Sequence, residues 1–136
     1  SAGEFINFDQ NRIVFRLADI ILLRAECRVR LGNNEGAIAD LNTIRERANA
    51  ELYHSSEYGG DLRYAIFKER EKELLMEGCR WYDVIRNEYY KTELYGGFRN
   101  VSKQDILDGV FFNAVDNNEF SENPLARQNT YWLKRM

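Results

Sequence analysis

The sequence contains few of the residues that build metal and disulfide sites. Among its 136 residues are two cysteines and one histidine. Neither cysteine has zinc-ligand spacing, and His54 lies in the polar stretch YHSSEYGGD with no cysteine or second histidine beside it. Two cysteines do not make a disulfide framework, so Cys27 and Cys79 are expected to be buried free thiols. A disulfide between them is the alternative. No metal and no cofactor is predicted.

Charge of one sign and long apolar runs are also missing. The net charge is −3, with Lys and Arg scattered among Asp and Glu, so a nucleic-acid partner, which needs one basic face, is not expected. No run reaches the roughly 20 apolar residues of a membrane helix. The opening SAGEF lacks the pattern of a signal peptide. The composition, 44% hydrophobic and 30% charged, is typical of one globular domain over residues 1–136.

Helical periodicity is the strongest structural signal. It predicts a helix over about residues 14–31, with two apolar faces and a polar stripe between them. One face holds Leu17, Ile20, Ile21 and Leu31, the other holds Ala18, Leu22, Ala25 and Val29, and the stripe holds Arg16, Asp19, Glu26 and Arg30. Such a helix is expected to be packed on two sides.

A second helix is predicted over about residues 35–49, after a turn at Gly32 and Asn33. The resulting hairpin, residues 14–49, resembles a tetratricopeptide repeat in LGNNEGAIADL, where small Ala25, Gly32 and Ala37 let two helices approach closely. A lone repeat cannot bury both of its faces. The hairpin is therefore expected to dock on something outside it.

The rest of the chain gives weaker signals. Asp61 is placed to cap a helix that runs to about Glu77, and Gly78 interrupts it before the pattern resumes, so residues 61–88 form a charged helix region. Residues 89–136 are predicted to be a loop and an extended tail, with one short helix at the capping-box spacing of Ser102 and Asp105. The predicted fold class is all-α: a tetratricopeptide-like hairpin, a further helix pair and an extended irregular tail.

The stretch EREKELLMEGCRWYDVIR is unusually charged. Glu69, Glu73 and Glu77 recur every four residues and so line one helix face. Paired catalytic acids of a glycosidase come from separate elements across a cleft, and a di-metal bundle needs Glu-x-x-His motifs that this stretch lacks. We therefore predict no catalytic residue, and interpret the stretch as a charged seam between packed helices. The predicted seam consists of Arg24, Glu69, Arg70, Glu73, Glu77, Arg80, Trp81, Asp83 and Arg86, with Arg24 and Arg28 expected to supply the facing charges.

Four motifs in register resemble a known family. RLADIILLRAECRVRLGN, LNTIRERA and AIFKEREKELLMEGCRWYDVIR follow the order and spacing of the carboxy-terminal region of the SusD/RagB family of outer-membrane nutrient-binding lipoproteins. The closing NPLARQNTYW is similar to that family's Asn-Pro and Gln-Asn motif. Two departures are FFNAV, where the family commonly has a Pro-Ile-Pro-like strand, and Thr130, where Pro-Gly is frequent.

The resemblance implies a binding protein and not an enzyme. Family members carry tetratricopeptide-like helices, are lipid-anchored on the extracellular face of the outer membrane, and act as the lid of a TonB-dependent, SusC-like transporter that imports oligosaccharides or peptides. They are several times longer than this chain, which is therefore expected to be a carboxy-terminal part, reaching the membrane only through a lipid anchor that it does not contain.

The resemblance does not transfer a ligand site, because the family usually holds its glycan with residues that precede this region. Within the chain, the candidates are Tyr89, Tyr90, Tyr95 and Phe98, unless these rings pack against other parts of the protein. The alternative function is a small tetratricopeptide-like protein interaction module, although no second copy of the repeat follows residue 61. A glycosidase is a distant third.

Overall fold

The computed structural model describes residues 14–135. They belong to two compact units, a first unit that ends at Arg80 and a second unit that begins at Trp81. All regular elements of the described residues are helices, which confirms the predicted all-α class. None of the described helices is both long and apolar enough to cross a membrane.

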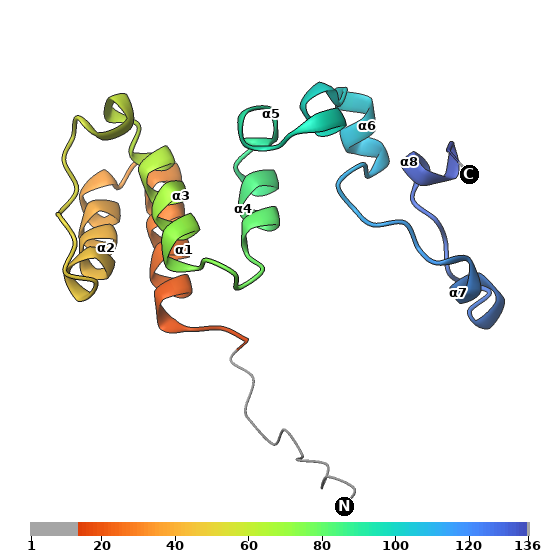
Figure 1. Ribbon diagram of the computed structural model, residues 1–136, viewed down its shortest axis with the longest axis horizontal. Coiled ribbons are helices and arrows are strands. Elements are labelled where there is room, and N and C mark those ends of the chain that lie inside the picture. The colour runs from red at the N-terminus through yellow and green to blue at the C-terminus, as the bar shows by residue number, and fades with distance from the viewer. Residues whose placement is uncertain (1–13, 136) are drawn as a thin grey trace, which may run out of the picture. The chain divides into compact units, whose positions relative to one another are not determined.

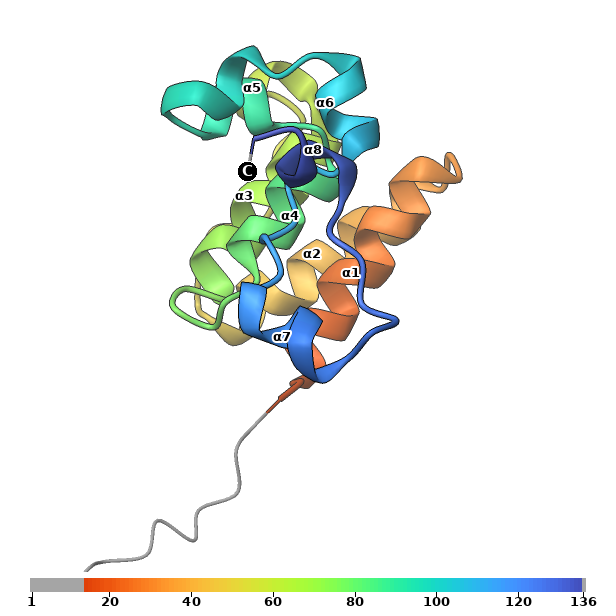
Figure 2. The same ribbon diagram turned by 90° about the vertical axis from the view of Figure 1, so that its right-hand side faces the viewer.

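Three helices form the first unit. They are α1 (Leu17–Arg30), α2 (Asn34–Arg47) and α3 (Leu62–Glu73), with a short 3₁₀ turn, η1 (Glu57–Gly60), before α3. Helix α1 packs against both α2 and α3, as the views in Figure 1 and Figure 2 show. The predicted helical hairpin is therefore present, and α3 adds a third helix to it.

The turn of the hairpin follows from two residues. Gly32 adopts a left-handed conformation, with φ of 78°, directly after α1. The Asn33 side chain then accepts a hydrogen bond from the Gly36 N–H at 2.9 Å and caps α2. Ala25 and Ala37 are fully buried where the helices meet, as the repeat-like pattern predicted. The core of the unit contains Ala18, Leu22, Ala25, Ala37, Leu41, Ile44, Leu62, Ala65 and Ile66.

Helix α1 differs from its predicted packing. Within the described residues it buries one apolar face only, while Leu17 is 74% exposed and Leu31 is 84% exposed. Two members of the expected polar stripe, Asp19 and Glu26, are buried because each meets an arginine. Cys27 lies on the outward side and is exposed.

The expectation of two buried thiols was wrong. Cys27 is exposed, and Cys79 is half-buried in the connection after α3. Both are free thiols. The spacing pattern could not separate the outward side of α1 from its core side, because both sides carry apolar residues.

Helix α3 begins as predicted and ends earlier. The Asp61 side chain accepts a hydrogen bond from the Tyr64 N–H at 2.9 Å. The helix stops at Glu73, and the Glu73 carbonyl accepts a hydrogen bond from the Arg16 guanidinium where a continuing helix would bond it to the N–H of residue 77. Met76 and Gly78 then adopt left-handed conformations, with φ of 66° and 80°.

The second unit is built from short helices. They are α4 (Arg80–Arg86), whose first residue is the last of the first unit, α5 (Tyr90–Glu93), the 3₁₀ turn η2 (Gly96–Asn100), α6 (Lys103–Asp108), α7 (Asn117–Glu122) and α8 (Thr130–Leu133). The predicted capping box of Ser102 and Asp105 is confirmed at the start of α6. Helices α7 and α8 are two short additions to the predicted extended tail, and their four to six residues are too few to show a period.

The tail returns to α6 through the Gln-Asn motif. Gln128 donates to the Val115 carbonyl at 3.1 Å and accepts from the Val115 N–H at 3.2 Å. Asn129 caps α8 by accepting from the Trp132 N–H at 3.1 Å. Its side chain also lies 3.2 Å from where a Cβ of Gly109 would be, and Gly109 has a left-handed φ of 96°. The motif therefore holds the tail in place.

Candidate functional site

The centre of the charged seam is Arg45, a residue that the sequence analysis did not include. Its side chain donates from Nε to Glu69 at 2.9 Å and makes two bonds to Glu57, at 2.7 and 3.0 Å. Arg45 is 5% exposed and Glu69 is 7% exposed. The hydrogen bonds from Arg45 lower the pKa of Glu57 to about 2. This cluster joins α2, η1 and α3.

A second buried pair joins α1 to α3. Arg70 donates from Nη2 to the Asp19 carboxylate at 2.8 Å and from Nη1 to the Asp19 carbonyl at 3.1 Å. Arg70 is 2% exposed and Asp19 is 6% exposed. A buried charge is tolerable only when it is paired and hydrogen-bonded, which explains why an aspartate occupies the core side of α1.

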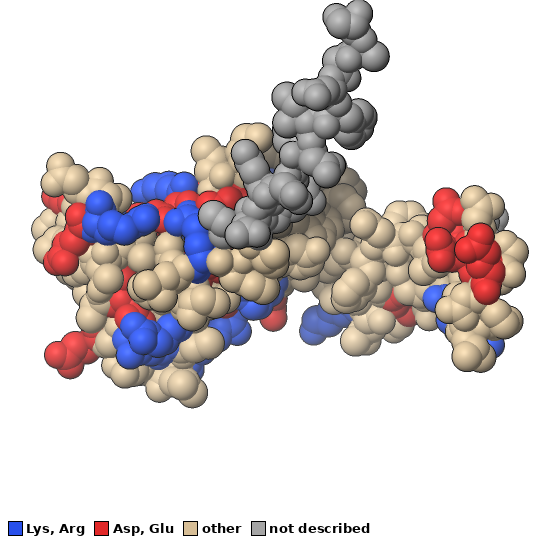
Figure 3. All heavy atoms as spheres, turned by 90° about the horizontal axis from the view of Figure 1, so that it is seen from below, with Lys and Arg blue, Asp and Glu red and all other residues tan. Residues whose placement is uncertain are grey.

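A third cluster lies at the end of α3. Arg16 donates from Nε to both carboxylate oxygens of Glu77 at 2.9 Å and also contacts the Glu73 carboxylate. Arg47 pairs with Glu73 from α2. The hydrogen bond from Arg16 lowers the pKa of Glu77, and the bonds to Glu77 and Glu73 raise the pKa of Arg16. Figure 3 shows the same interleaving of basic and acidic side chains over the first unit, at the left of the view.

The structure places Arg24 away from the glutamates. Its guanidinium makes two bonds to Asp40 of α2, at 3.0 and 2.7 Å, and Arg28 meets the same carboxylate at 2.8 Å. The expectation that Arg24 and Arg28 face the glutamates of α3 is therefore corrected. They stabilise the α1/α2 hairpin instead, because they point toward α2.

The remaining seam residues divide between the two units. Arg80, the last residue of the first unit, lies over the buried Phe67 ring, 4.5 Å from its centroid, and meets Glu71 at 3.1 Å. In the second unit, Arg86 pairs with Asp83 at 2.6 Å within α4. Trp81 belongs to the aromatic cluster described below.

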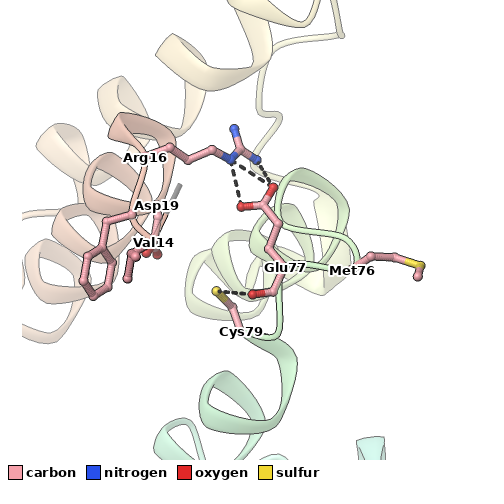
Figure 4. A pocket seen from close by; sticks show the side chains of 7 residues that line it. Val14, Arg16, Asp19, Met76, Glu77 and Cys79 are labelled. Carbon is pink, nitrogen blue, oxygen red and sulfur yellow. Dashed lines mark hydrogen bonds and ion pairs between the residues drawn. The ribbon is translucent and has the colours of Figure 1, made fainter. Parts of the chain in front are cut away.

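A hollow of about 380 Å³ opens beside the third cluster. It is lined by Val14, Phe15, Arg16, Asp19, Met76, Glu77 and Cys79. Figure 4 shows Arg16 turned toward Glu77, whereas Met76 points away from both. Met76 is 95% exposed. Arg16 and Glu77 pair with each other and Asp19 pairs with Arg70, so the charged residues that line the hollow are already in ion pairs.

A second hollow, of about 400 Å³, lies against the Arg45 cluster. It is lined by Arg45, Ala50, Glu51, His54, Ser56, Glu57, Glu69 and Lys72. Carboxylic acids that donate a proton in catalysis have a raised pKa, whereas that of Glu57 is lowered. Among the described residues, no group of three or more His, Cys, Asp and Glu side chains could hold a metal ion.

The aromatic candidates for ligand binding do not share one environment. Tyr90 and Phe98 pack with Trp81 and Phe111, with centroid separations of 5.1 Å for Tyr90 and Phe111 and 5.4 Å for Trp81 and Phe98. The indole N–H of Trp81 donates to the Phe111 carbonyl at 3.3 Å. This aromatic cluster is part of the packing of the second unit.

Tyr89 and Tyr95 differ in their exposure to solvent. Tyr89 is half-buried, and its carbonyl accepts from the Thr92 hydroxyl at 3.1 Å. Tyr95 is 84% exposed, and the Arg99 guanidinium lies 5.1 Å from its ring centroid. Tyr95 is thus the candidate that presents a ring to solvent.

Sequence reasoning missed the basic residues that the seam uses. Arg16, Arg45 and Arg47 supply the charges that face the glutamates of α3. The signal for Arg45 was its position four residues after Leu41, on the buried side of α2. A long cationic side chain at such a position predicts a buried acidic partner.

The described residues form an all-helical fold built on a tetratricopeptide-like hairpin, in which arginines pair with carboxylates between the helices. The SusD family profile matches residues 4–133, so the chain belongs to the SusD family.

Two curated relatives come from Formosa agariphila. SusD-like protein P38 is 33% identical over 124 residues, which cover 85% of this chain and 24% of that protein. SusD-like protein P25 is 45% identical over 85 residues, which cover 59% of this chain and 16% of that protein. No solved structure matches the chain significantly. The matched region is therefore a quarter or less of the length of either relative.

Proposed function

We propose that this chain is the carboxy-terminal part of a cell-surface lipoprotein that binds an oligosaccharide without cleaving it. The protein passes its ligand to a TonB-dependent, SusC-like transporter, for which it forms the lid at the extracellular face of the outer membrane. The observation that carries the proposal is membership of the SusD family over residues 4–133. Each relative is much longer than the region that it shares with this chain, which supports the assignment as a part.

The charge arrangement supports binding in preference to hydrolysis. A glycosidase needs two carboxyl groups across a cleft, one of them able to donate a proton. In the first unit, the carboxylates of Glu57, Glu69 and Glu73 are each held by an arginine. Their geometry joins helices and leaves no matched acid pair among them.

Tyr95 is the proposed contact for the sugar within this chain. A sugar ring stacks its apolar C–H face on an aromatic ring, and Tyr95 is 84% exposed. Arg99 lies at the same ring and can donate to sugar hydroxyls. The other three candidates take supporting roles in this proposal: Tyr90 and Phe98 through the aromatic cluster, and Tyr89 through the loop backbone.

Binding to a panel of neutral and sulfated oligosaccharides, measured by calorimetry, tests the ligand contact. The longer polypeptide encoded with this chain is used, and Tyr95→Ala is compared with a control, Tyr82→Ala. Tyr82 is also an exposed tyrosine, and it lies on α4. We expect Tyr95→Ala to weaken binding about tenfold, through loss of one stacking contact, and Tyr82→Ala to leave it unchanged. Equal affinities of the two variants would contradict the role of Tyr95.

Co-purification with the membrane transporter tests the partner. We expect the longer polypeptide to bring down a TonB-dependent transporter from solubilised outer membranes. Failure to bind any glycan together with failure to capture a transporter would overturn the proposed function. Capture of soluble protein partners without glycan binding would instead favour the helical interaction module.

A further inference from the structure

Arginines in this chain usually pair with carboxylates. A guanidinium nitrogen lies within 3.4 Å of an Asp or Glu oxygen in Arg16, Arg24, Arg28, Arg30, Arg45, Arg47, Arg70, Arg80, Arg86 and Arg135. The carboxylate offsets the positive charge of each of these groups. An arginine outside this pattern keeps a positive charge that a ligand can meet.

Arg99 of η2 is outside the pattern. Its guanidinium donates to two backbone carbonyls, from Nε to Leu94 at 2.5 Å and from Nη2 to Thr92 at 3.5 Å, and it lies 5.1 Å from the centroid of the Tyr95 ring. Within residues 14–135, no carboxylate lies at ion-pair distance from it. Carbonyl oxygens carry only partial charge, so the positive charge of Arg99 is not compensated inside the second unit.

The two carbonyl bonds hold this charge beside Tyr95. They tie η2 to the end of α5, against which it packs. A guanidinium has five N–H donors in a planar fork, and the two bonds leave the other donors of Arg99 for an acceptor from outside. Because Arg99 is exposed, such an acceptor can reach it. The planar fork matches two oxygens of a carboxylate or a sulfate.

The exposed charge around Tyr95 is positive. Residues 90–100 contain Lys91 and Arg99, which are exposed, and Glu93, which is half-buried. A Cβ built at Gly96 or Gly97 would meet no atom within 4 Å, so the described chain leaves open space beside the ring. A ligand at Tyr95 therefore approaches a basic, uncovered surface, although the chain as a whole has a net charge of −3.

We propose that the ligand bound at Tyr95 is an acidic oligosaccharide and that Arg99 selects it by binding a carboxylate or sulfate group. The inference rests on the proposed function, in which Tyr95 is the sugar contact, and adds the chemical class of the sugar. An acidic substituent on the stacked sugar, or on its neighbour in the oligosaccharide, reaches the guanidinium past the edge of the ring. A hydroxyl at the same place leaves the charge of Arg99 uncompensated, and its hydrogen bonds are weaker than those of an anion.

Calorimetry with two matched pairs of probes tests the inference on the longer polypeptide encoded with this chain. Oligosaccharides of a hexuronic acid are compared with the same oligosaccharides after carboxyl reduction, and sulfated oligosaccharides with the same ones after desulfation. The acidic member of at least one pair should bind about tenfold more tightly than its neutral member. The pair that shows the preference identifies the anion as a carboxylate or a sulfate.

Arg99→Gln should bring the ratio of acidic to neutral affinity close to one. The matched control is Arg127→Gln, because the Arg127 guanidinium also bonds backbone carbonyls, those of Pro124 and Ala126 at 2.9 and 2.8 Å, and the change removes the same charge. The control should keep the wild-type ratio. The ratio separates recognition of charge from a loosened loop, since a loosened loop weakens the binding of both members.

Salt provides a second measurement that needs no variant. Raising sodium chloride from about 0.05 M to about 0.5 M should weaken binding of the acidic member severalfold, because salt screens exposed charges over a Debye length of about 10 Å at about 0.1 M. Binding of the neutral member should not change.

Equal affinities within both pairs would overturn the inference and leave the proposed function standing. A preference that survives Arg99→Gln, or that does not weaken with salt, would overturn it in the same way. Binding of no glycan, acidic or neutral, would contradict the proposed function and the inference with it.

Discussion

Arg45 of α2 and Glu69 of α3 form an ion pair that is closed off from solvent, with 2.9 Å between Nε and Oε2 and side chains that are 6% and 9% exposed. Arg45 also holds Glu57, so one guanidinium ties together two helices and the segment between them. These three charged residues are therefore part of the internal packing of the first unit. Removing one of them should lower the free energy of unfolding.

Arg45→Ala should lower the free energy of unfolding by about 3 to 5 kcal/mol, because it leaves the buried Glu69 carboxylate with a longer ion pair, 3.8 Å to the exposed Lys72, in place of the 2.9 Å bond from Arg45. The matched control is Arg24→Ala, which removes a more exposed side chain and leaves Asp40 paired with Arg28 at 2.8 Å. Urea unfolding followed by circular dichroism measures both variants. An Arg45→Ala midpoint equal to that of Arg24→Ala would show that the buried pair does not contribute as the structure indicates.

The stability of the first unit should fall in acid through Glu57. Hydrogen bonds from Arg45 lower the pKa of Glu57 to about 2 in the folded protein, below the ordinary value of 4.5. Because the folded pKa is the lower one, the pair contributes fully above about pH 4.5, and the contribution is lost as the pH falls through about 2. Glu57→Gln should be less stable than the wild type at about pH 6 and should show a flatter pH dependence below about pH 4.5.

Urea midpoints collected between about pH 6 and about pH 2.5 measure this effect. Glu51→Gln is the control, because the Glu51 side chain is 84% exposed in the same loop. A wild-type and a Glu57→Gln curve with the same slope in acid would contradict the prediction.

Arg80→Ala should lower the melting temperature, which the charged-seam interpretation of the sequence also predicts. The structure adds the reason: the guanidinium lies 4.5 Å from the centroid of the buried Phe67 ring and 3.1 Å from Glu71. The free energy of unfolding should fall by about 1 to 2 kcal/mol. Arg80→Lys keeps the charge without the planar group and should restore only part of it. Differential scanning calorimetry decides, and an unchanged Arg80→Ala melting temperature would contradict the interpretation.

Gln128→Ala should loosen the tail of the second unit. The Gln128 amide bonds both the N–H and the carbonyl of Val115, at 3.2 and 3.1 Å, and alanine makes neither bond. Hydrogen exchange at the Val115 N–H should rise about tenfold. Gln104→Ala is the control, because the Gln104 amide bonds only the exposed turn of α6 through Asp108 at 2.9 Å. Equal hydrogen-exchange rates at the Val115 N–H in the two variants would contradict the prediction that the Gln-Asn motif holds the tail.

The local features of the fold were predictable from the sequence. Gly32 and Asn33 mark the turn between α1 and α2, Asp61 caps α3, and Ser102 with Asp105 starts α6. These features depend on a few neighbouring residues, since a cap or a left-handed turn is satisfied within three or four positions. The family assignment was predictable for a related reason, because its motifs are runs of adjacent residues in register.

The partners of the charges were not predictable in the same way. Arg16 reaches Glu73 and Glu77 across about 60 positions, and Arg70 reaches Asp19 across 51. Helical spacing shows that a carboxylate shares a face with its neighbours and does not show which helix covers that face. For this reason Arg24 was expected at the glutamates of α3, while the structure places it at Asp40.

The aromatic candidates separate in the same manner. Tyr90, Tyr95 and Phe98 are equivalent as a sequence pattern, yet Tyr90 and Phe98 lie in ring contacts while Tyr95 is 84% exposed. Periodicity, caps and motifs, which are local, were enough to establish the helices, their order and the family. The tertiary structure alone decided which charge meets which, where α3 stops and which ring faces solvent, because burial and pairing depend on segments far apart in the chain.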